Sequence, residues 1–365
     1  MTRPIAPHIL ALNAYEPGKP EEELRRELGI DAIVKLASNE NAYGPSPRVA
    51  EALAATAWNL HRYPDPRGHD LRQALAAHHR VAPDEIALGN GSNELIDLLC
   101  RVCAARGEHV VFGHPSFPCY RIGAVAQELA HDAIPLRDDV EWSVEDLIGA
   151  VRNDTRLLFV ASPNNPTGSY LDRQSLERLL TQVPSDVVVV LDEAYFEYAS
   201  ASDYVPATEL RHLRPRLVIL RTFSKAYGLA ALRVGYALAE PELVHTINRL
   251  RAPFNVGTIG QRLACVALED HAHLRTTVEA TIDARQELRA GLVERGLRVP
   301  ESQANFLLVY TPTPGRGVYE ALLREGVIVR PMASPLTSAI RVTVGRPEEN
   351  ARFLEALDRV LGRAP

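Results

Sequence analysis

Short apolar runs alternate with longer amphipathic segments along most of this chain, a pattern that predicts strands alternating with helices. Residues 186–191 form a near-continuous β-branched run, which is typical of a strand buried on both faces of a parallel sheet. The predicted strands span residues 33–37, 86–88, 109–112, 133–136, 157–161, 186–191 and 217–220. The predicted helices span 47–60, 69–80, 95–105, 144–151, 171–183 and 241–251. The pattern favours an α/β fold, with a mostly parallel central sheet flanked by helices.

The chain divides into regions that differ in their content of proline, glycine and charged residues. Residues 1–35 contain several prolines, and we predict an N-terminal arm there. Residues 36–251 hold the alternating pattern and are predicted to form one large domain. A polar break at 252–257 precedes a long helical region that runs to residue 295. Short strands and helices then alternate, so residues 252–365 are predicted to form a small α+β C-terminal domain. These last elements span 304–310, 318–325, 327–330, 340–344 and 347–361.

The composition is that of an ordinary globular protein. Of 365 residues, 46% are hydrophobic and 24% charged, and a net charge of −6 without a basic, aromatic-interleaved stretch argues against nucleic-acid binding. The longest apolar runs are of strand length and the N-terminus has no signal-peptide pattern, so we expect a cytoplasmic protein without a membrane span. Cys100 and Cys103 form a CxxC pair inside an apolar helical pattern, without further ligands at zinc spacing, so we expect core thiols and no metal site.

One lysine stands beside two hydroxyls at the end of a predicted strand. Lysine and arginine total 40, yet only three are lysines, and Lys225 follows Thr222 and Ser224 directly after the run at 217–220. A lysine can be tuned to form a Schiff base with a carbonyl, which arginine does poorly because it stays protonated. The hydroxyls and Arg233 suit a phosphate. The stretch therefore predicts a carbonyl cofactor bearing a phosphate, although a solvated loop lysine is the alternative for Lys225 alone.

Polar turns follow several other predicted strands, at the edge of an α/β sheet where ligands bind. Residues 89–94 are a glycine-rich turn before a helix, which suits a phosphate but is also compatible with a simple helix cap. Residues 162–168 hold Asn165 between prolines, so its amide can point at one ligand atom. Asp192 ends the run at 186–191. A buried carboxylate there needs a partner such as a protonated pyridine nitrogen, unless it caps the next helix.

Five more residues are candidates on weaker grounds. Phe117 could lie against an aromatic ligand or pack in the core, and Tyr63 is held in a rigid loop by the prolines that follow it. Tyr15 lies in a turn that could place its hydroxyl over a site. Arg330 and Arg341 stand at strand ends, where an arginine is either a surface charge or a bidentate partner for a carboxylate or phosphate.

Taken in order, these motifs resemble the fold-type I, pyridoxal-phosphate-dependent aminotransferases over nearly the whole chain. The motifs are Gly-Asn-Gly-Ser-Asn-Glu (89–94), Ser-Pro-Asn-Asn-Pro-Thr-Gly (162–168), Asp-Glu-Ala-Tyr (192–195), Thr-Phe-Ser-Lys (222–225), Arg233 and Arg341. Within that family the chain is most similar to the histidinol-phosphate and aromatic aminotransferases. That likeness rests on Tyr-Glu-Pro-Gly-Lys (15–19), Leu-Ala-Ser-Asn-Glu-Asn (36–41), Arg-Tyr-Pro-Asp (62–65) and Arg-Val-Thr-Val-Gly (341–345).

The resemblance implies a role for each matching residue. Lys225 would carry pyridoxal 5′-phosphate as a Schiff base and move the proton. Asp192 would pair with the ring nitrogen, and Tyr195 and Asn165 would hydrogen-bond the ring oxygen, so Lys225, Asp192 and Tyr195 would be catalytic. The residues implied to hold the cofactor are Gly91, Ser92, Asn93, Phe117, Asn165, Asp192, Tyr195, Thr222, Ser224, Lys225 and Arg233, with Tyr63 reaching in from the partner subunit of a homodimer. The residues implied to bind substrate are Tyr15, Asn39, Arg330 and Arg341.

The implied reaction moves an amino group between glutamate/2-oxoglutarate and histidinol phosphate, in histidine biosynthesis. Departures from the family pattern bear on the choice of donor: Phe117 stands where Tyr is common, Asn93 where Asp is common, and Ala42 where Pro is usual. An aromatic amino acid (phenylalanine or tyrosine) therefore stays open as the alternative substrate. A related decarboxylase is a further alternative. A cofactor-binding regulator is disfavoured because the N-terminal arm is too short for an added DNA-binding domain.

Overall fold

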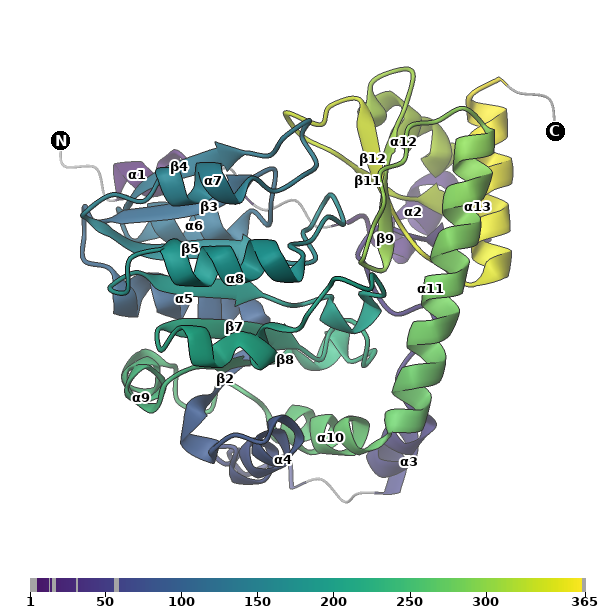
Figure 1. Ribbon diagram of the computed structural model, residues 1–365. Coiled ribbons are helices and arrows are strands. Elements are labelled where there is room, and N and C mark those ends of the chain that lie inside the picture. The colour runs from purple at the N-terminus through teal and green to yellow at the C-terminus, as the bar shows by residue number, and fades with distance from the viewer. Residues whose placement is uncertain (1–4, 13, 15–17, 31, 56–58, 363–365) are drawn as a thin grey trace.

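The computed structural model describes residues 5–12, 14, 18–30, 32–55 and 59–362 (Figure 1). Within them, one large sheet consists of strands in the spatial order β2 (Ile86–Asn90), β8 (Val234–Leu238), β7 (Leu217–Thr222), β6 (Val188–Asp192), β5 (Thr155–Ala161), β3 (His109–His114) and β4 (Ala130–Pro135). Pairs among β7, β6, β5, β3 and β4 are parallel, and β8 is antiparallel to both of its neighbours. The predicted α/β class with a mostly parallel central sheet is confirmed.

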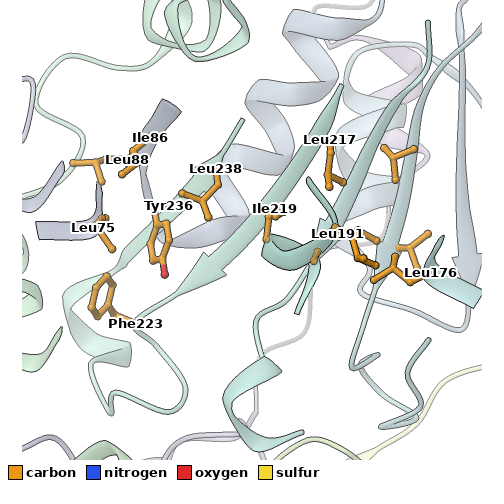
Figure 2. Close-up of a cluster of buried hydrophobic side chains, with 14 of the residues drawn as sticks. Leu75, Ile86, Leu88, Leu176, Leu191, Leu217, Ile219, Phe223, Tyr236 and Leu238 are labelled. Atoms are coloured by element: carbon orange, nitrogen blue, oxygen red, sulfur yellow. The ribbon is translucent and has the colours of Figure 1, made fainter. Parts of the chain in front are cut away.

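Two layers of helices cover the large sheet. One apolar cluster joins it to α4 (His69–His79), α7 (Val144–Gly149), α8 (Arg173–Gln182) and α10 (Thr258–Glu269). A second cluster joins the other face to α5 (Gly91–Cys103), α6 (Cys119–Ala126) and α9 (Pro241–Leu250). Figure 2 shows the first cluster, in which Leu191, Ile219 and Leu238 come from the adjacent strands β6, β7 and β8. Burial on both faces explains why these strands are near-continuously apolar in sequence.

Side chains of β6 and β7 alternate between these two layers. Val190 and Leu220 belong to the cluster with α5, whereas Leu191 and Ile219 belong to the cluster with α4. The period of two holds to the ends of both strands and at Glu193, the residue after β6. Asp192 and Thr222 therefore face the α5 side. Glu193 and Arg221 face the α4 side. Two buried polar pairs therefore flank the same sheet edge on opposite faces.

The C-terminal part forms a second, smaller unit. Its antiparallel sheet has the order β11 (Arg330–Pro331), β12 (Ala339–Thr343) and β9 (Phe306–Tyr310), and β10 (Val327–Ile328) pairs in parallel with β1 (Val34–Lys35). Its helices are α11 (His271–Glu294), α12 (Gly315–Arg324) and α13 (Pro347–Val360), joined by α2 (Glu21–Leu28). Figure 1 shows α11 beside α13 at one end and near α3 (Pro47–Ala55) at the other. α10 packs on α3 and α4 of the large unit, and the predicted domain boundary near residue 252 stays a prediction.

The structure departs from the sequence-based elements at several places; for example, the predicted strand 327–330 is the two strands β10 and β11, which lie in different sheets. The long helical region before residue 295 is two helices, because Asp270 is non-helical and its carboxylate accepts the His273 N–H as the N-cap of α11. Helix α6 and strand β8 were not predicted. β8 is short and carries Gly235, where a Cβ would lie 2.4 Å from the Ser92 backbone nitrogen. This glycine allows the start of α5 to lie against β8. Among the described residues, none of the helices has the length and apolar character needed to cross a membrane.

Candidate active site

One cavity of about 830 Å³ lies where the carboxyl ends of β5, β6 and β7 meet the N-terminus of α5. It extends to β11 and β12 of the smaller unit, and α1 (Pro7–Leu10) contributes Ile9 to its wall. The predicted site residues that line it are Asn39, Ser92, Asn93, Phe117, Asn165, Asp192, Tyr195, Thr222, Ser224, Lys225, Arg233, Arg330 and Arg341. Both units therefore contribute to a single concave site, as is common for enzymes that bind small molecules.

Lys225 is the only lysine that borders this cavity within the described part of the chain. Its Nζ donates a hydrogen bond to the Ser38 carbonyl at 3.2 Å and lies 5.5 Å from the centre of the Tyr195 ring. Withdrawal of its ammonium group from water lowers the pKa of Lys225 to about 7, and the positive charge of Arg341 acts in the same direction. A large fraction of its amine is therefore neutral near pH 7, the form that attacks a carbonyl carbon.

Asp192 ends β6 in a buried position and has two donors. The Tyr120 hydroxyl donates to its Oδ2 at 2.8 Å, and the Ala194 backbone N–H donates to its Oδ1 at 3.2 Å. Burial raises the pKa of Asp192 to about 6, while these donors act against the rise. The group is therefore mostly ionised at neutral pH. Sequence reasoning gave Tyr120 no role, because α6, which carries it, was not predicted.

The start of α5 and the end of β7 form a cradle for an anion. Arg233 donates to the Ser224 hydroxyl at 3.1 Å, and the Gly91 N–H donates to the Arg233 carbonyl at 2.9 Å. Gly91 has φ +69°, and a Cβ on it would lie 2.5 Å from an Arg233 guanidinium nitrogen. Only glycine permits this approach. The guanidinium of Arg233 and the hydroxyl of Ser224 thus lie near the N-terminus of α5, a 13-residue helix whose first N–H groups have no acceptor within the helix. This arrangement is suited to binding a phosphate.

Two arginines of the smaller sheet reach the cavity. Arg330 in β11 and Arg341 in β12 are direct cross-strand partners. The Arg341 guanidinium donates to the Asn165 side-chain oxygen and, at 2.7 Å, to the Ala37 carbonyl. Asn165 thereby joins the turn after β5 to the smaller sheet. Both arginines border the cavity, so this wall is suited to an anionic substrate group.

Tyr195 and Phe117 also border the cavity. Burial raises the pKa of Tyr195, so its hydroxyl is protonated at neutral pH. The Asn39 side-chain amide donates to the Tyr195 oxygen at 3.0 Å. Asn39 was predicted to bind substrate, and that role stays a prediction beside this contact with Tyr195. The Phe117 ring meets the Tyr120 ring edge to face, with 5.8 Å between centroids.

Tyr63, which was predicted to reach the cofactor from a partner subunit, lies at the surface of its own chain. Tyr63 is 81% exposed and stacks on the Phe254 ring, with 4.5 Å between centroids. It does not line the cavity of its own chain, and its expected role in a partner subunit stays a prediction. Tyr15 lies outside the described residues. In the described part of the chain, no cluster of histidine, cysteine or acidic side chains could hold a metal ion. Cys100 is fully buried in the core and unpaired.

Comparisons with known proteins decide the family. The model for aminotransferase class I and II matches residues 31–357. This chain belongs to the class I and II aminotransferases. The aminotransferase is 45% identical to histidinol-phosphate aminotransferase 2 of Pseudomonas aeruginosa, over 97% of each chain. It is 43% identical to histidinol-phosphate aminotransferase of an Anaeromyxobacter species, over 98% of this chain and 99% of that one.

A solved structure is similar over the same extent. It is the crystal structure of histidinol-phosphate aminotransferase from Sinorhizobium meliloti in complex with pyridoxal-5′-phosphate, with a TM-score of 0.89 and 29% identity. The match covers 99% of this aminotransferase and 98% of that chain. Both units and their arrangement are therefore shared, and the cavity described above lies in the part of the fold that the two proteins have in common.

Proposed function

We propose that this aminotransferase moves an amino group between glutamate/2-oxoglutarate and histidinol phosphate, a step of histidine biosynthesis. Pyridoxal 5′-phosphate is its cofactor, and the cavity fits that molecule at three points. The cradle of Gly91, Ser224 and Arg233 suits the phosphate, and the Asp192 carboxylate suits a protonated ring nitrogen. The amine of Lys225 suits the aldehyde. When bound, the cofactor supplies an electron-withdrawing ring that stabilises negative charge at the substrate carbon.

The protein's own residues then have distinct tasks. Lys225 would bind the cofactor covalently and, once displaced by the amino substrate, carry the proton to and from its reacting carbon. Asp192, held ionised at neutral pH by Tyr120 and Ala194, would keep the ring nitrogen protonated. Asp192 and Tyr195 are buried, which limits the access of water and so strengthens their interactions.

The choice of substrate depends on the two arginines of the smaller sheet, Arg330 and Arg341, which border the cavity. Histidinol phosphate ends in a phosphate ester, and glutamate ends in a second carboxylate. The two guanidinium groups of Arg330 and Arg341 would therefore serve both half-reactions with one anion site. Relatives that are 43% and 45% identical over nearly the whole chain bear the name histidinol-phosphate aminotransferase, which supports the same reading.

Donor kinetics test this proposal. The ratio kcat/KM for each donor in a ping-pong reaction reports its own half-reaction, so histidinol phosphate, phenylalanine and tyrosine are compared with 2-oxoglutarate as acceptor. We expect histidinol phosphate to be the best donor. We also expect Arg330→Gln to lower its kcat/KM about 10- to 100-fold, the equivalent of about 1.5–3 kcal/mol for a charged hydrogen bond. Arg324→Gln, at an exposed arginine on α12, is the matched control and should change little.

The same measurement decides between this proposal and its rivals. Ile9, Phe117 and Ile122 give the cavity an apolar wall that would also accept an aromatic ring. A higher kcat/KM for phenylalanine or tyrosine would therefore make this an aromatic amino acid aminotransferase. Release of carbon dioxide without formation of a keto acid would instead indicate a decarboxylase. If no donor yields glutamate, the substrate assignment fails.

We also propose a cytoplasmic homodimer with shared active sites. Tyr63 and Phe254 form an exposed stacked pair, and Leu60 and Leu250, close to them in the chain, are 75% and 41% exposed. Apolar side chains in such positions are typical of a surface that a partner covers. The four cysteines are unpaired, which suits a reducing compartment.

A further inference from the structure

Three buried polar side chains, from three distant parts of the chain, form a relay at the cavity. Thr343 belongs to β12 of the smaller unit, Asn39 follows β1, and Tyr195 follows β6 of the large unit. Their exposed fractions are 4%, 1% and 6%, so water does not compete for their hydrogen bonds. Of the three, Tyr195 and Asn39 line the cavity, whereas Thr343 lies behind them.

The hydrogen bonds of Thr343 set the orientation of the Asn39 amide. The Asn39 backbone N–H donates to the Thr343 hydroxyl oxygen at 2.9 Å. The proton of that hydroxyl is then directed to the Asn39 side-chain oxygen, 3.2 Å away. With its oxygen engaged there, the amide presents its NH₂ group to the Tyr195 oxygen at 3.0 Å. An asparagine side chain has one donor end and one acceptor end, so its partner on one side decides what it offers on the other.

The backbone around Asn39 is held in place from the same side. Asn39 has φ +54°, a left-handed conformation that Asn tolerates better than most residues. The Asn305 amide donates to the carbonyl groups of Asn39 and Glu40 at 3.1 and 3.2 Å. The Thr343 N–H donates to the Leu36 carbonyl at 2.9 Å. The smaller unit thus fixes the segment whose Ser38 carbonyl accepts from Lys225.

The direction of one proton follows from this arrangement. A phenolic oxygen that accepts from Asn39 keeps its own O–H free to donate elsewhere. Since Tyr195 lines the cavity, that donor is available to the oxygen on the cofactor ring. If the Asn39 amide were reversed, its oxygen would take the Tyr195 proton, and the tyrosine would face the cavity as an acceptor instead.

We propose that Thr343 is a positioning residue for the reaction: through the Asn39 amide, its hydroxyl directs the Tyr195 proton into the cavity. This rests on the proposed placement of the cofactor. Thr343 touches neither substrate nor cofactor, and it is one of several buried threonines in this chain. Its hydroxyl acts on the reaction only through the Asn39 side chain: because Thr343 donates to the Asn39 oxygen, Asn39 donates to Tyr195. Side chains in buried polar networks influence one another in this way.

The experiment compares Thr343→Val, which removes the hydroxyl at nearly equal volume, with Thr343→Ser, which keeps it. The readout is the pH midpoint of the absorbance change of the cofactor bound to Lys225, measured without substrate. A donor to the ring oxygen stabilises negative charge there and disfavours the protonated form of the nitrogen at Lys225. Loss of that donor therefore raises the midpoint. Charges around Lys225 and Tyr195, from Arg341, Arg233, Glu40 and Asp192, are unchanged in both variants.

We expect Thr343→Val to move the midpoint upward by most of the shift that Tyr195→Phe produces, and Thr343→Ser to stay close to the wild-type value. In the double variant Thr343→Val/Tyr195→Phe, the threonine change should add nothing, because its effect passes through the lost hydroxyl. Thr311→Val is the matched control. Thr311 is a buried threonine of the same unit, its hydroxyl donates to the Thr313 and Ser338 carbonyls, and it does not line the cavity.

Three results would overturn the proposal. They are an unshifted midpoint in Thr343→Val, an equal shift in Thr311→Val, and a full threonine effect in the absence of the Tyr195 hydroxyl. The last result compares the double variant with Tyr195→Phe alone, so it can be interpreted even if Thr343→Val lowers stability. Absence of any pH-dependent cofactor absorbance in the wild-type protein would be a failure of the proposed function rather than of the relay.

Discussion

Lys225 differs from the other two lysines of the chain in what surrounds it. Lys19 pairs with Glu27 and Glu23 at 2.6 and 3.1 Å, and Lys35 donates to both oxygens of Glu40 at 2.9 Å. Lys225 has a carbonyl as its hydrogen-bond acceptor. Carboxylates hold an amine in its charged form, whereas a site without one favours the neutral form. At the residue scale, the lowered pKa of Lys225 follows first from its burial, and among the described residues no carboxylate forms an ion pair with its amine.

This difference predicts a pH-dependent gain in stability for Lys225→Met in the cofactor-free protein. The pKa of Lys225 falls from its ordinary value of 10.5 to about 7, so between these pH values the unfolded chain binds the proton and the folded chain does not. Burial of the Lys225 amine therefore lowers the free energy of unfolding by its full amount below about pH 7, and by less as the pH rises toward 10.5. Removal of the amine should thus raise the free energy of unfolding more at about pH 7 than at about pH 9.5, as measured by urea titration. A gain independent of pH, or equal in Lys35→Met, would contradict the shift.

Sequence motifs predicted many of the residues at the cavity, because several of these motifs follow strands of the large sheet whose carboxyl ends lie at one edge. They did not predict Tyr120 or the relay from Thr343. Tyr120 follows Pro118 in a segment without a clear helical period, and only the packing of α6 brings its hydroxyl to Asp192. Thr343 reaches Asn39 across 304 positions of sequence. Contacts of that kind depend on how the two units pack, which a local pattern does not contain.

At the scale of elements, a buried ion pair joins the ends of β6 and β7 behind the cavity. Arg221 donates to one Glu193 oxygen at 2.7 and 3.0 Å, and the Ala207 N–H donates to the other. The Arg221 guanidinium also lies 3.6 Å from the centre of the Phe196 ring. Because Asp192 precedes Glu193 and Thr222 follows Arg221, the pair holds the two strand ends that carry the catalytic groups. The sequence could not reveal it, since the alternation places these residues on the face opposite the cavity.

Glu193→Gln should therefore cost about 3–5 kcal/mol of unfolding free energy, the usual cost of removing one partner of a buried ion pair. Its side chain and that of Arg221 are only 3% and 4% exposed, so water cannot replace the lost charge. Denaturant titration of the cofactor-free protein measures the loss. The control is Glu209→Gln, whose pair with Arg173 has side chains 56% and 51% exposed and should contribute less than about 1 kcal/mol. Similar losses in the two variants would show that Glu193 does not act as a buried charge.

At the scale of the whole molecule, the site extends over both units and, in the proposed dimer, over both subunits. Arg233 belongs to the large unit, Arg330 to the smaller one, and Tyr63 would come from the partner. One chain explains the first two. In one chain Tyr63 is exposed and stacked on Phe254, so the Arg-Tyr-Pro-Asp motif that contains it indicates an assembly of two chains.

Phe254→Asp should weaken the proposed dimer, because it puts a charge into the exposed aromatic pair. Sedimentation velocity should show a dimer for the wild-type protein and an increased monomer fraction for the variant, with a parallel loss of cofactor affinity if Tyr63 reaches the partner's phosphate. Val293→Asp, at a position 46% exposed on α11, is the control for a charge added to an apolar surface position. A wild-type protein that sediments as a monomer while binding cofactor tightly would contradict the shared site.

In the proposed reaction Lys225 alone binds the cofactor aldehyde, and borohydride reduction shows which lysine carries the cofactor. Reduction of the protein loaded with pyridoxal phosphate, followed by peptide mass mapping, locates the modified lysine, and the chain has only three to distinguish. We expect one label per chain, on Lys225, and no label at this position after Lys225→Ala. A label on Lys19 or Lys35, or a protein that binds no cofactor at all, would contradict it.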